Sequence, residues 1–107
     1  MIKASTYRPS LEHLLAAQDR LSSVVRHTPL ETNDFYSEKY DAQIHFKRED
    51  LQVVRSYKIR GAFNRICQLS SEEKRAGVVC ASAGNHAQGV AYSCQKLKVK
   101  ASIYMPA

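Results

Sequence analysis

The fold of this chain is most readily inferred from the segment Val78-Val79-Cys80-Ala81-Ser82-Ala83-Gly84-Asn85-His86-Ala87-Gln88-Gly89. It opens with a continuous apolar run over 78–81, which is typical of a strand that is covered on both faces of a parallel sheet. The small residues at 82–84 predict a turn, and the residues after them follow the helical period. The apolar face of this helix would carry Ala87, Val90, Ala91, Cys94 and Leu97.

A second strand is expected over 101–105, and Pro106 marks its end. A strand, a turn, a helix and another strand make one βαβ unit, in which the two strands run parallel. The sequence therefore predicts an α/β fold that is built on a parallel sheet.

Another helix is expected over 57–69, upstream of this unit. Ser56 is a plausible side-chain cap for it, and Lys58 lies in its first turn, off the apolar stripe. A capping-box pattern over 70–73 then predicts a short helix that Gly77 ends. The apolar stripe of the first of these helices would be Ile59, Ala62, Phe63 and Ile66.

The N-terminal half is expected to alternate helices with short extended segments, after a loose leader over 1–9. Proline restricts the residue before it to extended backbone, and alternation of polar and apolar residues indicates a half-buried strand. The expected elements are a helix from Leu11 capped by Ser10, an extended segment at 28–32, a short helix to Lys39 capped by Asn33 or Asp34, and a half-buried strand at 43–47.

The length of the chain sets a limit on what it could fold into alone. It has 107 residues, of which 44% are apolar, so it is long enough for about one small domain. Parallel strands need cover on both faces and neighbours at their edges. We therefore expect an N-terminal piece of a longer protein, and the alternative is a small, complete α/β domain.

The net charge and the cysteines indicate which partners and which kinds of site the chain could have. The net charge of +6 suits a nucleic acid, another anionic partner, or simply a solvated surface, since the basic residues are spread along the chain. The long spacings of Cys67, Cys80 and Cys94 argue against a zinc site. Each of them falls on a position that reads as apolar, so buried free thiols are expected. No secretory signal or membrane-spanning run is present, so a cytoplasmic location is expected.

The turn at 82–84 could bind an anion. The backbone N–H groups of Gly84, Asn85, His86 and Ala87 would point out of a helix N-terminus, which favours a carboxylate or a phosphate. The turn also lies at the carboxyl end of a parallel strand, where open α/β sheets bind ligands. The alternative is an ordinary capped turn.

Lys58 is a candidate nucleophile. The positive end of its helix, together with Arg55 and Arg60 nearby in sequence, would favour a neutral amine. The alternative is a solvated lysine of the kind that most helices carry. His86 could act as a base, or it could be a hydrogen-bonded structural residue.

Three strings together resemble one family. The segments 47–52 and 56–62 resemble the cofactor-attachment segment of the serine/threonine dehydratases, and 82–89 resembles their cofactor- and substrate-binding turn. With the Thr28-Pro29-Leu30 string, the resemblance covers about residues 25–107. It implies the three-layer parallel sheet of the fold type II (tryptophan synthase β-like) pyridoxal-phosphate enzymes, incomplete in this chain. The chain would then be the N-terminal part of the catalytic domain.

The resemblance also implies roles for individual residues. Lys58 would hold pyridoxal 5'-phosphate covalently and would then act as the acid and base, and Asn85 would hydrogen-bond the ring hydroxyl of the cofactor. No metal is implied. The loop that holds the substrate carboxylate would consist of Ser82, Ala83, Gly84, Asn85 and His86.

Ala83 helps to choose a reaction. The serine racemases resemble this chain in both strings, but they carry a second serine where this chain has Ala83, and alanine cannot move a proton. A one-base elimination is therefore favoured. The family's glycine-rich phosphate cup would lie beyond residue 107, so the 107-residue chain alone is expected to be inactive.

The implied activity of the parent protein is the dehydration and deamination of L-threonine to 2-oxobutanoate and ammonia, the first step of isoleucine biosynthesis. The partner would be a small amino acid, L-threonine or L-serine, with neither nucleic acid nor membrane, and the parent would be a homo-oligomer. The alternatives are a catabolic serine/threonine dehydratase and, in another class, a non-catalytic basic interaction fragment.

Overall fold

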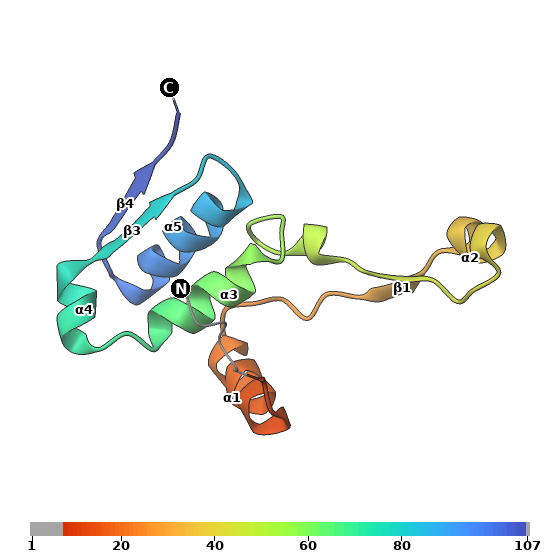
Figure 1. The fold of residues 1–107 in the computed structure, drawn as a ribbon, viewed down its shortest axis with the longest axis horizontal. Helices are drawn as coiled ribbons and strands as arrows, with labels where there is room; N and C mark the ends of the chain where they lie inside the picture. The colour runs from red at the N-terminus through yellow and green to blue at the C-terminus, as the bar shows by residue number, and fades with distance from the viewer. Residues whose placement is uncertain (1–7, 107) are drawn as a thin grey trace, which may run out of the picture.

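The computed structural model describes residues 8–106, so most of the expected leader over 1–9 lies outside the described residues. Within this range the chain forms the elements shown in Figure 1. They are α1 (Leu11–Leu21), β1 (Leu30–Thr32), α2 (Asp34–Tyr40), β2 (His45–Lys47), the 3₁₀ turn η1 (Glu49–Leu51), α3 (Lys58–Cys67), α4 (Ser71–Ala76), β3 (Val78–Ala81), α5 (Asn85–Leu97) and β4 (Ala101–Tyr104).

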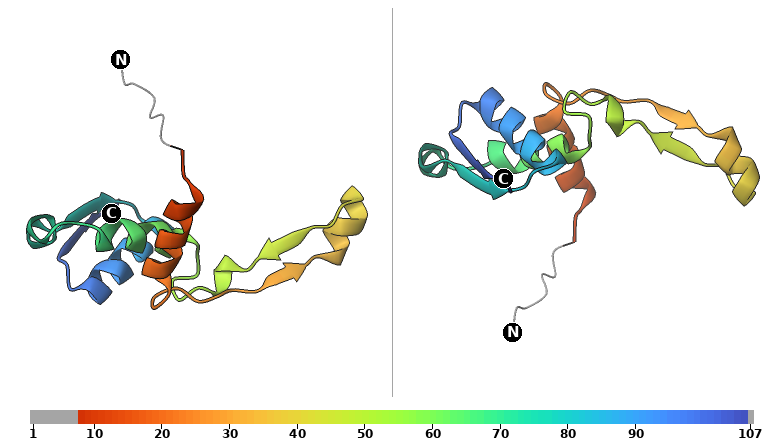
Figure 2. Two further views of the ribbon diagram at one scale, coloured as in Figure 1. Left: turned by 90° about the horizontal axis from the view of Figure 1, so that it is seen from below. Right: turned by 90° about the horizontal axis from the view of Figure 1, so that it is seen from above.

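The predicted βαβ unit forms the main lobe. β3 pairs parallel with β4, with Val78 opposite Ala101 and Ala81 opposite Tyr104, and α5 connects the two strands. Figures 1 and 2 show α3 and α5 lying side by side against this sheet, while α1 packs at the other side of α3. The predicted α/β class and parallel pairing are confirmed.

The core lies between α3, α5 and β3. Its buried residues are Ala62, Ile66, Val90, Cys94 and Val99. The predicted stripe of α3 is confirmed, because all four of its residues are buried. On α5 the prediction is wrong for Ala91, which is exposed, whereas Gly89 and Ser93 are buried. The reason is that α3 lies against the Gly89 face of α5, so the buried face is turned away from Ala91.

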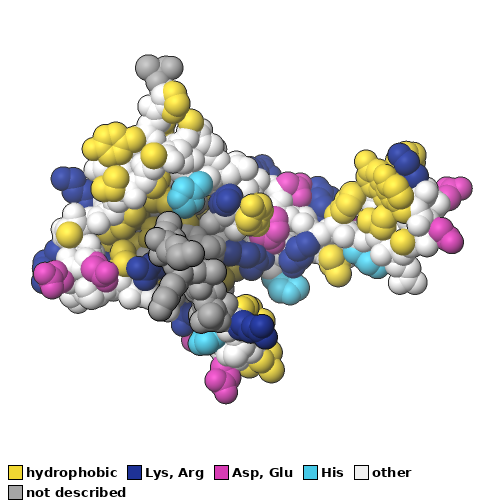
Figure 3. Space-filling model, viewed as in Figure 1, with side chains coloured by type: hydrophobic (Ala, Val, Ile, Leu, Met, Phe, Trp, Pro, Cys, Tyr) yellow, Lys and Arg dark blue, Asp and Glu magenta, His cyan; other side chains and the backbone are white. Residues whose placement is uncertain are grey.

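β3 is covered on one face. Val79 is 70% exposed, while Val78 and Cys80 are half-buried, so the expected cover on both faces is not provided by the described residues. The helices α3 and α5 lie on one side of the strand, and nothing in residues 8–106 covers the other side. Figure 3 shows hydrophobic side chains reaching the surface over this lobe.

The segment from β1 to β2 projects from the lobe as an arm (Figures 1 and 2). β1 pairs antiparallel with β2, and Tyr36 of α2 contacts the rings of Phe35, Tyr40 and Phe46. The prediction of a half-buried strand is wrong in its burial, because all three residues of β2 are exposed. A two-stranded arm has no second layer that could bury its strands, and the contact of Tyr36 with Phe46 still leaves Phe46 42% exposed.

Three of the predicted helix caps are confirmed and one is wrong. The side chain of Asn33 caps α2 by accepting a backbone hydrogen bond at 2.9 Å. The hydroxyls of Ser10 and Ser70 each accept a backbone hydrogen bond from the residue three positions later. Ser56 does not cap α3, because the first helical residue is Lys58 and the cap position therefore falls on Tyr57. Ser56 is instead buried, and its Oγ has no hydrogen-bond partner among the described residues.

Cys67, Cys80 and Cys94 are free thiols, as expected, although only Cys94 is fully buried. Burial raises the pKa of the Cys94 thiol above its ordinary value. Among the described residues, no helix combines the length and the apolar character that a bilayer crossing requires.

Candidate active site

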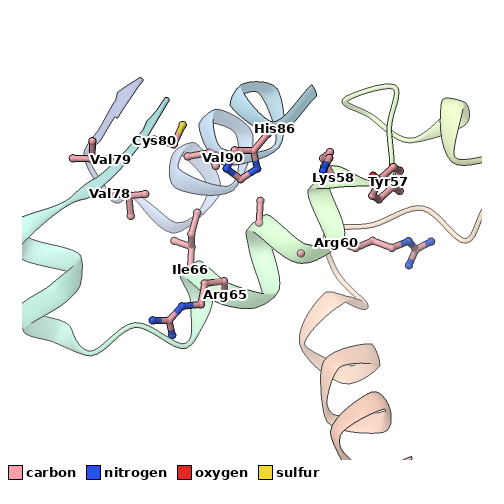
Figure 4. A pocket seen from close by; sticks show the side chains of 12 residues that line it. Tyr57, Lys58, Arg60, Arg65, Ile66, Val78, Val79, Cys80, His86 and Val90 are labelled. Carbon is pink, nitrogen blue, oxygen red and sulfur yellow. The ribbon is translucent and has the colours of Figure 1, made fainter. Parts of the chain in front are cut away.

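A cleft of about 470 Å³ opens between α3, β3 and the start of α5. Lys58 and His86 line it, and apolar side chains form much of its wall (Figure 4). These apolar residues include Ile66, Val78, Val79 and Val90. The cleft thus places an amine beside a surface on which an aromatic ring could lie.

The helices α3 and α5 begin at the same end of the lobe, so Lys58 and the turn before α5 are neighbours. Gly89 makes this approach possible. A Cβ atom at Gly89 would lie 3.1 Å from the carbonyl carbon and the carbonyl oxygen of Lys58. The apolar spacing of α5 does not predict this role of Gly89, although a glycine inside a helix is itself a signal of close packing.

Gly89→Ala is expected to destabilise the fold, whereas Gly61→Ala is expected to stabilise it by roughly 0.5–1 kcal/mol, the usual gain in helix propensity. At Gly61 a Cβ meets nothing within 4 Å, but at Gly89 it meets the backbone of α3. Overpacking of this kind costs about 1–3 kcal/mol, which outweighs the propensity gain. Urea unfolding of both variants measures the difference. A Gly89→Ala variant as stable as Gly61→Ala would contradict the close approach.

The sequence suggested four backbone N–H groups for binding an anion. In the structure, two of the four already donate to a side chain of the turn before α5. The Oγ of Ser82 accepts hydrogen bonds from the N–H groups of Gly84 and Ala87, each at 3.3 Å. The N–H groups of Asn85 and His86 have no acceptor among the described residues. Together with the positive end of the 13-residue helix α5, they form a smaller anion-binding turn than expected.

Ser82→Ala is expected to lower stability by about 1 kcal/mol, because it removes the acceptor that caps the first turn of α5. Ser71→Ala serves as the control, since Ser71 is an exposed first-turn residue of α4 with no side-chain hydrogen bond among the described residues. Thermal unfolding followed by circular dichroism compares the two. Equal melting temperatures for the two variants would mean that the Ser82 hydroxyl does not cap α5.

The structure brings together some of the predicted site residues and separates others. Lys58 and His86 line the cleft, but Ser82 and Ala83 line a second hollow beside β4. Gly84 and Asn85 are exposed at the start of α5 and line neither cavity. The turn and Lys58 therefore lie at one end of the lobe without sharing one cavity.

The surroundings of Lys58 differ from the expectation in one respect. Its Nζ lies 5.1 Å from the centre of the Tyr57 ring, an arrangement in which the ring face attracts the ammonium. Arg60 is not an unbalanced positive charge, because it forms a two-pronged ion pair with Glu49 at 2.8 Å. This pairing is the main cause that lowers the pKa of Glu49 to about 2.

The chemistry of these groups fits a cofactor that carries an aldehyde and an aromatic ring. A lysine amine can bind an aldehyde covalently, the apolar wall suits a ring, and the turn before α5 suits an anionic group. Within residues 8–106, no three His, Cys, Asp or Glu side chains gather as they would around a metal ion.

Comparison with known proteins agrees with this chemistry. L-threonine dehydratase biosynthetic IlvA of Bacillus subtilis (strain 168) is 57% identical over 96 residues, which are 90% of this chain and 23% of that protein. The protein of the same description from Staphylococcus epidermidis (strain ATCC 12228) is 58% identical over 87 residues, covering 81% of this chain and 21% of the relative. The chain thus spans about a quarter of the length of these curated relatives.

Solved structures share the fold. A threonine deaminase from T.th. superposes with a TM-score of 0.79 at 40% identity, over 92% of this chain and 31% of that one. Maize serine racemase gives a TM-score of 0.85 at 33% identity, over 94% and 31% of the two chains. The family described as "Pyridoxal-phosphate dependent enzyme" matches residues 21–107. With Lys58 in its cleft beside the turn before α5, the chain belongs to this family of pyridoxal-phosphate-dependent enzymes, in the fold type II class.

Proposed function

We propose that this chain forms part of the catalytic site of a dehydratase that converts L-threonine to 2-oxobutanoate and ammonia, the step that begins isoleucine biosynthesis. The observation that carries the proposal is the half-buried Lys58 in an apolar cleft, next to the N-terminus of α5. The identity of 57% to a biosynthetic threonine dehydratase supports the choice of substrate. The cytoplasmic location and the homo-oligomeric state of the parent protein stay predictions.

Two groups of residues would have separate roles, one in binding the cofactor and the other in binding the substrate. Lys58 would hold pyridoxal phosphate through its Nζ and would move a proton at that atom, and Asn85 would hydrogen-bond the ring hydroxyl. The turn of Ser82, Ala83, Gly84, Asn85 and His86 orients the substrate carboxylate, using the N–H groups that Ser82 does not occupy. When bound, the cofactor supplies a ring that withdraws electrons from the substrate.

Ala83 favours elimination over racemisation. A methyl group can neither accept nor donate a proton, so the face of the substrate near Ala83 has no base at this position. Likeness of fold does not distinguish the two reactions, because serine racemases and threonine deaminases both superpose on this chain. The identity of this one side chain therefore supports a reaction with a single base, Lys58.

The proposal is tested with a chimera. The 96-residue segment of the Bacillus subtilis relative that aligns with this chain is replaced by the residues of this chain. We expect the purified chimera to release 2-oxobutanoate from L-threonine. A chimera that folds and binds pyridoxal phosphate but releases none would overturn the proposal, and activity on L-serine alone would indicate the catabolic alternative.

The isolated 107-residue chain is expected to release no 2-oxobutanoate under the same conditions. Its cleft is open along β3, where Val79 is exposed, so a bound substrate would stay in contact with water. Turnover by the purified chain alone would contradict this expectation.

A further inference from the structure

We propose that Glu49 is a positioning residue for Lys58, because it clamps Arg60 and thereby holds the first turn of α3, on which the lysine stands. This inference rests on the proposed role of Lys58 and assigns a task to the ion pair of Glu49 and Arg60, of which the arginine also lines the cleft. Glu49 itself lies outside the cleft that Lys58 lines.

The carboxylate of Glu49 is held from several directions. Arg60 donates to it from both Nε and Nη2 at 2.8 Å, and the hydroxyl of Thr28 donates at 2.6 Å. The amide of Gln52 adds weaker contacts at 3.3 and 3.4 Å. Its side chain is only 15% exposed, so water competes little for these donors. A guanidinium held at two points has a fixed orientation, unlike one held at a single point.

The loop that carries Glu49 is itself held in place by the buried side chain of Gln52. Gln52 is fully buried, and its side-chain oxygen accepts from the N–H of Arg26 at 2.9 Å while its amide donates to the Arg26 carbonyl at 2.8 Å. This doubly bonded amide fixes the chain just before Thr28, the second donor to Glu49. The carboxylate therefore connects α3 to a rigid loop.

The ion pair of Glu49 and Arg60 restrains the turn of α3 that carries Lys58. Arg60 lies two residues further along α3, and residues so spaced lie on different faces of a helix. The N–H of Arg60 donates to the carbonyl of Tyr57 at 3.0 Å, which closes the turn around Lys58. On the other side the backbone of Lys58 lies against Gly89 of α5. The turn is thus held between Glu49 and α5.

The same loop provides a matched control. Asp50, next to Glu49, also accepts two hydrogen bonds from an arginine, but its partner is Arg48 in the loop itself. The side chain of Asp50 is 57% exposed and has no contact with α3 among the described hydrogen bonds. Asp50→Asn therefore removes a comparable ion pair without releasing the Lys58 turn.

The experiment uses the 107-residue chain with pyridoxal phosphate as the probe, followed by borohydride reduction and peptide mass spectrometry. The measured quantity is the ratio of adduct at Lys58 to adduct at Lys39, an exposed lysine on the arm. Glu49→Gln and Arg60→Lys are expected to lower this ratio by at least about tenfold, since small misplacements of reacting groups cost that much or more. Asp50→Asn should leave it unchanged.

The ratio is compared under conditions in which circular dichroism shows every variant to be folded. A merely structural role for Glu49 would lower stability but leave the ratio in the folded protein unchanged, and that result would overturn the inference. Should Glu49→Gln not fold, Glu49→Asp and Arg60→Lys keep both charges, lose the two-pronged geometry and allow the same comparison.

A second readout separates this inference from the proposed function. If the chain without substitutions forms no more adduct at Lys58 than at Lys39, this result counts against the proposed role of Lys58. Amide hydrogen exchange at Arg60, measured without cofactor, then tests whether Glu49 holds the first turn of α3 in place. Faster exchange in Glu49→Gln than in Asp50→Asn supports the clamp, and equal exchange in the two variants overturns it.

Discussion

Replacing Lys58 with alanine is expected to lower the release of 2-oxobutanoate by the chimera at least about 10³-fold. The amine is the proposed point of covalent attachment and also the proposed acid and base, so both contributions are lost together. No other lysine lines the cleft in the described part of the chain, so none is placed to substitute for it. The measurement is the steady-state rate with saturating L-threonine.

Lys39→Ala is the control for Lys58→Ala. The ammonium of Lys39 also lies over an aromatic ring, that of Tyr40, at 5.4 Å, but on the arm rather than in the cleft. Its removal should leave the rate unchanged. A Lys58→Ala chimera that is folded and keeps a tenth or more of the activity would show that the nucleophile lies elsewhere.

The second large effect is a loss of stability in acid. The pKa of Glu49 is about 2 in the folded chain, chiefly because Arg60 donates to the carboxylate, against an ordinary value of 4.5. Since this pKa is lowered on folding, the stabilisation is present above pH 4.5 and is lost as the pH falls from about 4.5 towards 2. A shift of this size corresponds to at most about 3 kcal/mol, and the partial exposure of Arg60 reduces it.

Urea unfolding at a series of pH values between 7 and 2 measures this dependence. Glu49→Gln should be less stable than the unmodified chain at pH 7, and the difference between the two should shrink as the pH falls. The exposed pair of Asp50 and Arg48 is screened by salt, so 1 M NaCl should remove most of the effect of Asp50→Asn but little of that of Glu49→Gln. A difference between Glu49→Gln and the unmodified chain that stays constant over this range would contradict the lowered pKa.

Local patterns predicted much of the main lobe. The apolar spacing of α3, the run in β3 and the capping box at Ser70 involve residues within a few positions of one another, so the sequence carries them directly. Two of the errors involve a single position at the edge of a correctly predicted helix. Ser56 lies one position too early to cap α3, and Ala91 borders the apolar face of α5 without being covered.

The family and the importance of Lys58 could be inferred from the sequence, because the strings around residues 58 and 82–89 keep a characteristic order and spacing. The surroundings of the lysine could be seen only in the folded chain. Glu49 reaches Arg60 across 11 positions and Thr28 across 21, and Gly89 meets the backbone of Lys58 from another helix. Such contacts depend on how the helices and loops pack in space, and neither periodicity nor capping preference carries that information.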